Sequence, residues 1–307
     1  MTLNTKNYIA IDIAKDSLQV QAPNCTCALN YDKDALQEWI TSITKGTIIV
    51  FEATGGYERM LMQTLIDHHI PYARVSPDRV RAFAKSEGIK AKTDPIDAKM
   101  LLRFAEQKQL KPNNPPDPQR AKLVALLDRR SHLSSMHAQE KNRRQNSDAQ
   151  IHELIDTSLD FIEGQIDQID QQIRGLIGEH PVMQAQGKIL QSITGIGEVT
   201  AWSIIAYLEG IVSMKRNQMI ALAGLAPFNK DSGKSQKKRS IQGGRAKVRR
   251  VLYMAAATAA IHNPHIKEYV EGLRARGKPY KCAIVAAMRK LLIHAQSLLK
   301  NPENALA

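Results

Sequence analysis

The sequence has few cysteines, few aromatic residues and no long hydrophobic run. Its three cysteines, Cys25, Cys27 and Cys282, include no C-x-x-C pair. An odd, low count without that spacing argues against structural zinc and favours a reducing compartment. The longest apolar run, residues 251–261, is too short to span a bilayer. Because the N-terminus leads almost directly into a predicted strand, which is not the pattern of a signal peptide, we expect a cytoplasmic protein with no membrane partner.

Acidic residues are scarce relative to basic ones. The chain has 43 Lys and Arg against 30 Asp and Glu, which gives a net charge of +13 and a pI near 9.6. This excess favours a polyanionic partner, of which nucleic acid is the commonest. A basic protein without such a partner is the alternative. A length of 307 residues, 43% of them hydrophobic, allows two globular domains and a connector.

Strand and helix signals alternate over the first part of the chain. Short runs rich in β-formers predict strands, and apolar residues at helical spacing predict helices. The predicted strands are residues 8–14, 18–21, 26–30, 47–52 and 71–75, and the predicted helices are residues 33–43, 57–68, 77–87 and 94–107. Three early strands followed by alternating helices and strands indicate a mixed α/β domain. The order βββαβαβα is that of the ribonuclease H-like fold.

A proline-rich segment separates this domain from the rest. Residues 111–118 contain four prolines, which should interrupt any helix or strand. We predict a first domain over 1–110, a linker and coiled coil over 111–185, and a mostly helical domain over 186–307. The helices expected in the last domain are residues 214–223, 245–262 and 279–299.

Apolar residues recur at heptad spacing in the second half of the helical connector. This seam comprises Leu159, Ile162, Ile166, Ile169, Ile173 and Leu176, at alternating steps of three and four. Gln, Asp and Glu flank the seam, which suggests a coiled coil formed with another chain. The alternative is an amphipathic helix that packs on its own domain.

Two glycines lie between apolar helical runs near the start of the last domain. Gly195-Ile196-Gly197 looks like the turn of a helix-hairpin-helix, whose backbone amides next to a helix N-terminus can hold a phosphate. We therefore expect a DNA contact at Gly195 and Gly197. A plain helix–helix turn is the alternative, since tight turns also use glycine.

Four acidic residues stand out by their placement in the first domain. Asp12 lies inside the first apolar strand, Glu52 ends a separate apolar strand, and Asp94 and Asp97 share one face of a helix start. Burying an acid in an apolar strand is costly unless the acid is paired or binds a cation. Carboxylate oxygens suit Mg²⁺ or Mn²⁺. Two such ions about 4 Å apart can activate a water and stabilise the leaving oxygen in phosphodiester cleavage.

Three of these acids have a simpler explanation. Asp94 could be an N-cap, and Asp97 is favourable in the first turn of a helix. Glu52 could be a solvated acid at a strand end. Asp12 is the hardest of the four to explain without a partner or a metal ion.

Three segments resemble the DEDD motifs of a bacterial insertion-sequence transposase family: IAIDIAKDSL, VFEATGGYE and KTDPIDAKMLLRFA. The resemblance covers nearly the whole chain, in the right order. It implies a RuvC-like N-terminal domain, similar to the Holliday-junction resolvase, with metal ligands at Asp12, Glu52, Asp94 and Asp97. Better-studied members are bridge-RNA-guided recombinases. The resemblance therefore also implies double-stranded DNA and a guide RNA as partners, and assembly as dimers into a tetramer.

The C-terminal half carries a second signature of that family. Residues 222–256 resemble a segment in which Ser-Gly follows a Gly-Leu-x-Pro turn and a basic, glycine-containing stretch leads into a helix. On that match Ser232 is the catalytic serine, which would attack a phosphodiester and form a covalent phosphoserine link to DNA. Taken alone, the D-S-G-K sequence predicts only a turn. Ser235 and Ser240 are competing candidates.

Basic residues surround that serine. Residues 228–250 carry nine Lys or Arg and one acid, a local net charge of +8. Phosphate contacts by such residues give salt-sensitive binding that is independent of sequence, and a solvated charged loop is the alternative. The expected nucleic-acid-binding residues are Lys234, Lys237, Lys238, Arg239, Arg245, Lys247, Arg249 and Arg250.

Three other functions fit part of these patterns. A junction-resolving nuclease would use the four acids and water, without a covalent adduct. A sugar or acetate kinase-type enzyme also opens with an acid-bearing strand, but it carries a glycine-rich loop where this chain has Lys15 and Ser17. A non-catalytic DNA-packaging protein would not need buried acids. We therefore expect a recombinase.

Overall fold

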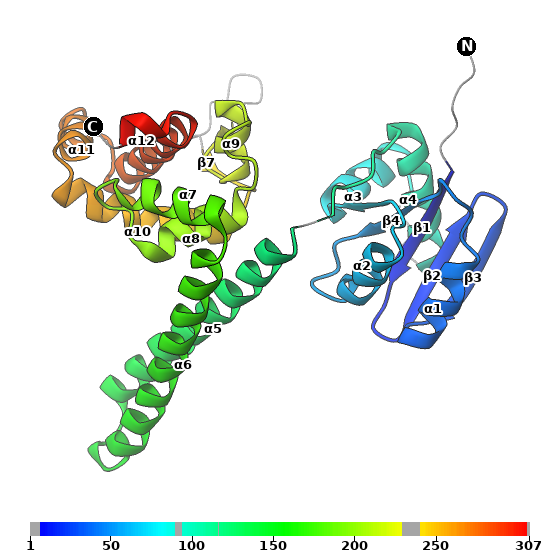
Figure 1. Ribbon diagram of the computed structural model, residues 1–307, viewed down its shortest axis with the longest axis horizontal. Coiled ribbons are helices and arrows are strands. Elements are labelled where there is room, and N and C mark those ends of the chain that lie inside the picture. Colours follow the sequence, from blue (N-terminus) through cyan, green and yellow to red (C-terminus); the bar gives the residue numbers. More distant parts are fainter. Residues whose placement is uncertain (1–6, 90–93, 116, 229–239, 306–307) are drawn as a thin grey trace. The chain divides into compact units, whose positions relative to one another are not determined.

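The computed structural model describes residues 7–89, 94–115, 117–228 and 240–305. The chain divides into two compact units, Met1–Pro115 and Pro116–Ala307 (Figure 1). This division falls within the proline-rich segment of residues 111–118. The helical connector lies in the same unit as the C-terminal helices, because it packs against them.

A five-stranded mixed sheet forms the centre of the N-terminal unit (Figure 1). Adjacent strands pair in the order β3-β2-β1-β4-β5. The strands are β1 (Tyr8–Ile13), β2 (Ser17–Ala22), β3 (Cys25–Asn30), β4 (Ile48–Glu52) and β5 (Tyr72–Val75). The first three strands pair antiparallel, whereas β4 pairs in parallel with β1 and with β5. Parallel pairs need crossover connections, and helices provide them here.

Helices cover both faces of this sheet. They are α1 (Lys33–Thr41), α2 (Glu58–Asp67), α3 (Pro77–Ser86) and α4 (Asp94–Lys108). Leu36 of α1 and Leu61 of α2 pack with Phe51 on one face. Phe83 of α3 packs with Val50 and with residues of α4 on the other face. Successive residues of a strand point to opposite faces of the sheet. Because helices cover both faces, β1 and β4 must be apolar at almost every position.

The predicted strands and helices of the first domain are present in the predicted order. Their ends differ from the predicted ends by no more than two residues, as expected where helix and strand ends fray. The mixed sheet with helices on both faces is compatible with a ribonuclease H-like fold. The α/β prediction for this part of the chain is therefore confirmed at the level of architecture.

Helices account for nearly all of the C-terminal unit that the structure describes. Beyond the connector they are α7 (Pro181–Gln191), α8 (Glu198–Tyr207), α9 (Arg216–Leu222), α10 (Ala246–His262), α11 (Pro264–Ala275) and α12 (Tyr280–Lys300). Ile204 of α8, Ala256 of α10 and Leu292 of α12 are fully buried in a shared core. The sequence analysis missed α11. Asn263 caps this helix by accepting from the Ile266 N–H, and proline occupies its first turn.

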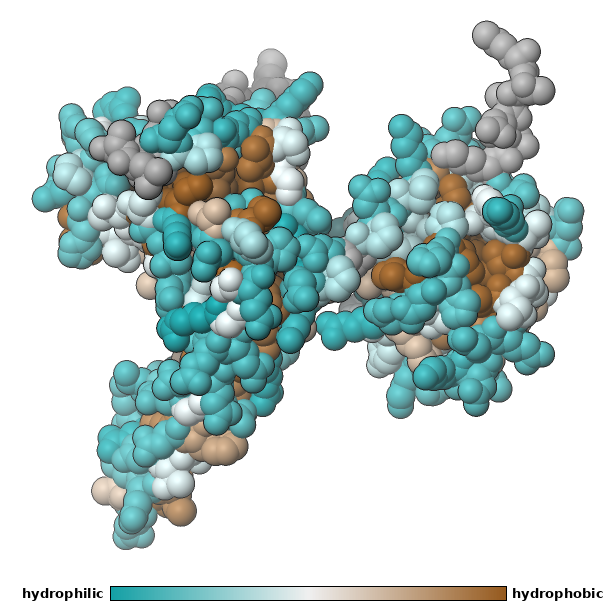
Figure 2. Space-filling view, in the orientation of Figure 1, coloured by the Kyte–Doolittle hydropathy of each residue, from teal (hydrophilic) through white to brown (hydrophobic). Residues whose placement is uncertain are grey.

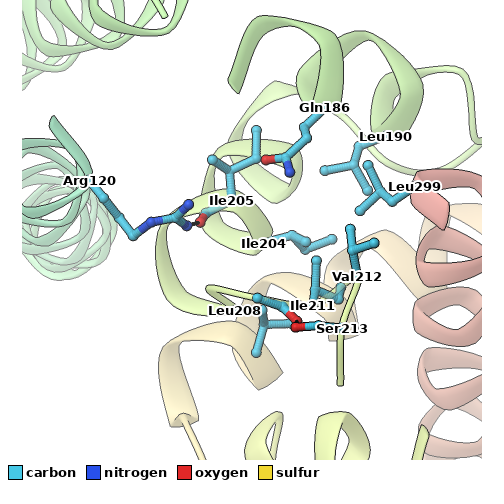
Figure 3. A pocket seen from close by; sticks show the side chains of 11 residues that line it. Arg120, Gln186, Leu190, Ile204, Ile205, Leu208, Ile211, Val212, Ser213 and Leu299 are labelled. Carbon is cyan, nitrogen blue, oxygen red and sulfur yellow. Dashed lines mark hydrogen bonds between the residues drawn. The ribbon is translucent and has the colours of Figure 1, made fainter. Parts of the chain in front are cut away.

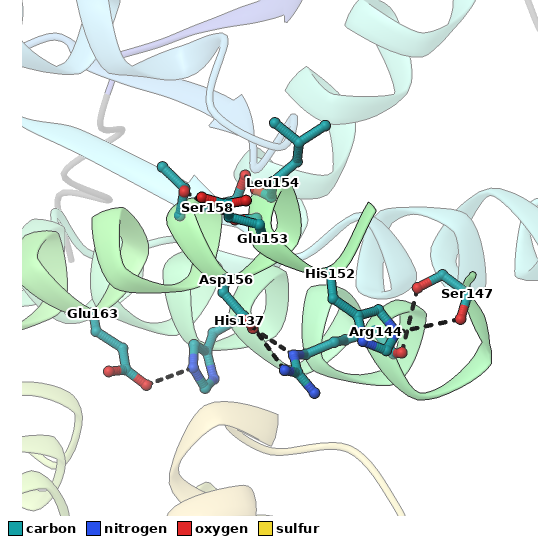
Figure 4. A network of polar contacts seen from close by, with 10 residues as sticks. His137, Arg144, Ser147, His152, Glu153, Leu154, Asp156, Ser158 and Glu163 are labelled. Carbon is teal, nitrogen blue, oxygen red and sulfur yellow. Dashed lines mark hydrogen bonds and ion pairs between the residues drawn. The ribbon is translucent and has the colours of Figure 1, made fainter. Parts of the chain in front are cut away.

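The connector is an antiparallel helical hairpin, made of α5 (Pro118–Asn146) and α6 (His152–Gly178) (Figure 1). The sequence analysis treated it as one helical stretch. Ion pairs join the two helices at matched distances from their turn. Figure 4 shows the Arg144–Asp156 ion pair and the contact of 2.7 Å between His137 Nε2 and a Glu163 carboxylate oxygen. Further along, Arg130 donates two hydrogen bonds to Asp170, of 2.6 and 2.9 Å.

The heptad seam is used largely within the chain. Ile162, Ile169 and Ile173 are buried, and α6 packs along α5. This agrees with the alternative explanation of the seam, an amphipathic helix packed on its own domain. Hydrophobic residues nevertheless remain exposed toward the turn end of the hairpin (Figure 2). The most exposed are Leu154 and Phe161, at 71% and 67%.

Arg120 joins the hairpin to the helical core. Its guanidinium reaches from α5 and donates a hydrogen bond to the Ile205 carbonyl of α8, beside a cavity of about 200 Å³ (Figure 3). Aliphatic side chains from α7, α8 and α12 line much of this cavity. The Arg120 Nε is buried without a hydrogen bond among the described residues, and the Glu209 carboxylate lies 3.8 Å from it. We interpret this cavity as a packing gap between α7, α8 and α12.

Helix α12 is long and apolar enough to cross a membrane, judged by length and composition, and it is the only such helix in the described ranges. Half of its apolar window is buried inside the unit. Leu291, Leu292 and Ala295 belong to the helical core. Core packing therefore accounts for its hydrophobicity.

Candidate active site

Asp12 and Glu52 lie next to each other near the carboxyl ends of the neighbouring strands β1 and β4. In the parallel pair of β1 and β4, Ile11 is opposite Phe51, so the next residue of each strand is an acid. The residues two positions before these acids lie in the core under α3 and α4. Both acids therefore point toward those two helices. In open α/β sheets, ligands bind outside the carboxyl ends of the strands, which is where these acids lie.

Helix α4 brings a third acid to the same place. Asp97, in the first turn of α4, lines a cavity of about 600 Å³ together with Asp12 and Glu52. All three residues are partly buried. Asp94 is the first residue of α4, and its side chain lies outside the described part of the chain. The structure thus brings three of the four predicted acids to one cavity.

This set of donors suits a divalent cation. Carboxylate oxygens are the hard ligands that Mg²⁺ and Mn²⁺ prefer, and here they come from two strands and a helix. Among the described residues, no group of three His, Cys, Asp or Glu side chains is arranged to hold an ion. The described acids therefore line a cavity whose oxygen atoms suit Mg²⁺ or Mn²⁺, but they do not by themselves form a complete set of metal ligands.

Two cations of α3 line the same cavity. Arg81 and Lys85 are exposed and lie one helical turn apart. Such cations can hold phosphate oxygens by charge-assisted hydrogen bonds. Neither residue was predicted from the sequence, because basic residues on an amphipathic helix usually form a solvated face. Only the tertiary structure distinguishes them from other surface cations.

Glu58 organises the loop that follows Glu52. Its side chain is 4% exposed and accepts hydrogen bonds from the Gly56 N–H at 2.8 Å and from Arg74 at 2.5 Å. It also accepts from the Thr54 N–H at 3.2 Å. Burial alone would raise the pKa of this carboxyl, but the backbone hydrogen bonds and Arg74 outweigh burial and lower it. Because Thr54 lines the acid cavity, Glu58 is a positioning residue at its rim.

Ser232 lies outside the described residues. So do Ser235 and the predicted nucleic-acid-binding residues Lys234, Lys237, Lys238 and Arg239. The structure describes the chain on either side of them. There, β6 (Pro227–Phe228) and β7 (Ser240–Ile241) pair antiparallel, which places Ser240 in a short strand.

Two glycines hold the base of that segment together. Gly224 and Gly244 have φ of +69° and +63°, and a Cβ on Gly244 would lie 2.3 Å from the Gly224 nitrogen. No residue other than glycine fits such a close approach. Arg249 supports it by donating a hydrogen bond of 2.7 Å to the Gly243 carbonyl. The described chain before Asn229 and after Arg239 is therefore held together at one place.

The other predicted cations differ in how free they are to bind a partner. Lys247 forms an ion pair with Asp128 of α5, and its Nζ lies 5.5 Å from the centroid of the Tyr207 ring. The Tyr207 hydroxyl donates to the same carboxylate at 2.5 Å, so Lys247 helps to join α10 to α5 and α8. Arg245 and Arg250 are exposed at the start of α10. Of the described cations that were predicted to bind nucleic acid, these two are among the more accessible.

Gly195 is required for packing. Its φ is +104°, and a Cβ there would lie 2.6 Å from the Ala259 Cβ of α10. Gly197, the N-cap of α8, has a φ of −85° and open space around its Cα. Glu198 follows it and is paired with Arg174, so a carboxylate already lies at this helix start. The turn joins α7 to α8 as predicted, and its contact with DNA stays a proposal.

Two family descriptions match the chain in succession. Residues 9–147 match a transposase family designated by the DEDD motif and IS110, and residues 187–271 match the transposase IS116/IS110/IS902 family. The first match contains all four predicted acids, and the second contains Ser232.

Known proteins resemble the chain along almost its whole length. It is 30% identical over 310 residues to a pilin gene-inverting protein of Moraxella lacunata and 31% identical to one of Moraxella bovis, with 96% of both chains covered in each case. It is also 26% identical over 147 residues to an uncharacterized 43.6 kDa protein of insertion element IS110 from Streptomyces coelicolor, which covers 47% of this chain and 35% of that protein. The chain belongs to the IS110 family of DEDD-type transposases and is a DNA recombinase.

Proposed function

We propose that the chain cleaves, exchanges and rejoins DNA strands with the help of a divalent metal ion and through a phosphoserine intermediate. The observation that carries this proposal is the cavity shared by Asp12, Glu52 and Asp97, in a chain whose family match extends across Ser232. The relatives named as pilin gene-inverting proteins support it, because inverting a DNA segment requires cut strands to be rejoined.

The metal ligands in this proposal are Asp12, Glu52, Asp94 and Asp97. When bound there, Mg²⁺ or Mn²⁺ would act as a Lewis acid toward phosphate oxygens. Arg81 and Lys85, on another wall of the cavity, would bind phosphates of the strand and hold it against the acids.

In the covalent step, the Ser232 hydroxyl oxygen forms a bond to phosphorus, and the bond from phosphorus to one bridging deoxyribose oxygen breaks. The proton lost by the serine ends on the departing oxygen. Attack by the hydroxyl of another strand end reverses these changes, which frees the serine and restores a phosphodiester. The phosphoserine conserves the energy of the broken bond, so no high-energy cofactor is required. Because a serine hydroxyl is a weak nucleophile unaided, Ser232 must meet the acid cavity of its own chain or of another subunit.

The partners in this proposal are double-stranded DNA and a guide RNA encoded by the same mobile element. The net charge of +13 and the basic residues 228–250 support a nucleic-acid partner. Phosphate contacts would hold the strands in place, while guide pairing would read the sequence. The turn at Gly195 and Gly197 would add phosphate contacts as a helix-hairpin-helix. RNA that co-purifies with the protein and pairs with the element's ends would identify the guide.

We further propose that the chain works in the cytoplasm as dimers that assemble into a tetramer. Residues 1–110 would contribute the metal domain, residues 111–185 the connector, and residues 186–307 the serine. The exposed Leu154 and Phe161 of the hairpin support pairing between chains, because exposed apolar patches often mark interfaces. The coiled coil would then form between hairpins of two chains.

A covalent-adduct assay with single variants tests the mechanism. Wild-type protein with Mg²⁺ and DNA from the element's ends should give a protein–DNA adduct that resists denaturation. Ser232→Ala and Asp12→Asn should abolish the adduct, and Ser235→Ala should keep it. Strand joining by Ser232→Ala would show that the serine mechanism is wrong. Cleavage without any adduct in wild type would indicate a nuclease that uses water.

A further inference from the structure

A basic cavity lies in the C-terminal unit, between the chain that precedes α9 and one face of α12. Its volume is about 610 Å³. Its cationic residues are Lys215, Arg216, Lys290 and Lys300, joined by His294. No Asp or Glu is among the described residues that line it. The sequence analysis gave these residues no role.

The fold sets the walls of this cavity. Gln296 of α12 is buried, and its Nε2 donates to the carbonyls of Ile211 and Met214 at 2.7 and 2.8 Å. These two hydrogen bonds fix the chain before α9 against α12. A cation–π contact positions Lys290, since its Nζ lies 4.5 Å from the centroid of the Tyr269 ring of α11. The cations therefore gather around a defined space.

The four cations of this cavity have no ion-pair partner among the described residues. Within the described ranges, Lys215, Arg216, Lys290 and Lys300 take part in none of the ion pairs. Like charges gathered around one cavity repel each other and raise the local concentration of anions. The arrangement thus favours a bound polyanion.

The length of the site matches a nucleic-acid strand. Lys290, His294 and Lys300 line the cavity along one face of α12. Ten residues of helix separate the first and the last, which is about 15 Å. A strand with a rise of about 3.4 Å per nucleotide presents roughly four phosphates over that length. A single small anion would contact only part of it.

We propose that this cavity binds the phosphodiester backbone of a nucleic-acid strand, as a site separate from residues 228–250 and from the turn at Gly195. This inference rests on the nucleic-acid partners of the proposed function. Helix α9 starts at the cavity and ends two residues before Gly224, so this short helix links the cavity to the turn at Gly224.

Two double variants of equal charge test the inference. Lys215→Gln with Lys300→Gln removes one cation from each wall of the cavity. Lys188→Gln with Lys267→Gln removes two exposed cations of α7 and α11 that do not line it. Binding of the full chain to a duplex DNA of arbitrary sequence, and separately to a single-stranded RNA, is measured in EDTA between about 50 and 200 mM salt.

For at least one probe, the cavity variant should bind roughly tenfold more weakly than the control variant, with a slope of log K against log salt that is shallower by about 1–2. A loss confined to DNA or to RNA identifies the strand that occupies the site. The probe should also protect Lys300, but not Lys267, from acetylation. Equal affinities and slopes for the two variants with both probes would overturn the inference and leave the proposed function intact. Failure of wild type to bind either probe would overturn both.

Discussion

At the scale of single residues, Asp97 is the acid that helix α4 contributes to the acid cavity. It is partly buried, and it shares the cavity with Asp12 and Glu52. In the proposed function these three carboxylates hold a divalent cation, which suits their hard oxygen atoms. Ion binding should therefore stabilise the N-terminal unit through these residues.

We expect Mg²⁺ to raise the Tm of wild type but not that of Asp97→Asn, because binding to the folded state alone stabilises it. In EDTA the variant should still fold, since the two side chains have nearly the same shape. Thermal unfolding with and without Mg²⁺ measures both effects. Asp78→Asn, at an exposed position on α3, is the matched control. The same Mg²⁺ shift in Asp97→Asn as in wild type would contradict a role for Asp97 in metal binding.

Glu58→Gln should destabilise the N-terminal unit by about 2–3 kcal/mol at pH 7, because it breaks the ion pair with Arg74 and the charged hydrogen bonds to the loop. Trp39 and Trp202 are the only tryptophans of the chain, one in each unit. Urea unfolding followed by Trp39 fluorescence, in a Trp202→Phe background, therefore reports on this unit alone. Glu87→Gln, which breaks the exposed pair with Arg103, should cost less than about 1 kcal/mol.

The pH dependence of that effect has a definite sign. Because the folded state lowers the pKa of Glu58, its stabilisation is complete above the ordinary Glu pKa of about 4.3 and is lost as the pH falls through the lower folded-state pKa. The difference between wild type and Glu58→Gln should be constant from pH 7 to about pH 5 and should shrink at more acid pH. A difference that grows on acidification would show that the carboxylate is not the stabilising group.

At the scale of helices and turns, two turns of the C-terminal unit need glycine because their backbone lies very close to another part of the chain. Gly195 lets the turn between α7 and α8 lie against α10, and Gly224 and Gly244 let two stretches of backbone approach each other closely. At these positions a Cβ atom would clash with parts of the chain that are distant in sequence. Packing therefore requires the glycines whether or not they contact phosphate.

Gly195→Ala should destabilise the C-terminal unit by about 2 kcal/mol or more, because the added Cβ would lie 2.6 Å from that of Ala259 and the positive φ would be strained. Gly197→Ala should change stability by less than about 1 kcal/mol, since its φ is negative and its surroundings are open. Trp202 fluorescence in a Trp39→Phe background measures both. Equal effects would mean that α10 does not constrain this turn. Weaker DNA binding by a stable Gly197→Ala would support the phosphate contact.

Assembly belongs to the scale of the whole molecule. The hairpin buries most of its heptad seam internally, yet Leu154 and Phe161 remain exposed on α6. An internal hairpin and pairing between chains are compatible, since two hairpins can meet through a face that neither uses internally. Helices of this length also need an apolar partner surface for stability in water.

We expect Leu154→Glu with Phe161→Glu to lower the molar mass measured by light scattering from that of an oligomer to that of a monomer. Helix content should be unchanged, because both side chains point away from the hairpin core. Gln171→Glu, at an exposed position of the same helix but on a different face from Leu154 and Phe161, should leave the oligomer intact. An oligomer that survives the double substitution would place the interface elsewhere.

The sequence by itself determined the architecture of the N-terminal unit and the identity of its acids. The local sequence was sufficient for this. Short runs of β-forming residues identify the strands, and apolar residues at helical spacing identify the helices between them. The spacing of Asp94 and Asp97 likewise followed from helical geometry alone. The break inside the connector was missed because the helix ends there are polar and carry no change of pattern. Helix α11 was missed although Asn263 and Pro264 together are a recognisable helix start.

The tertiary structure decided which residues meet. The register of β1 against β4 places Asp12 beside Glu52, and helix packing adds Arg81, Lys85 and the basic cavity of α12. It also assigned Lys247 to an ion pair with Asp128 and most of the heptad seam to the interior. Contacts between residues distant in the chain depend on how whole elements pack, and local sequence patterns do not encode that packing.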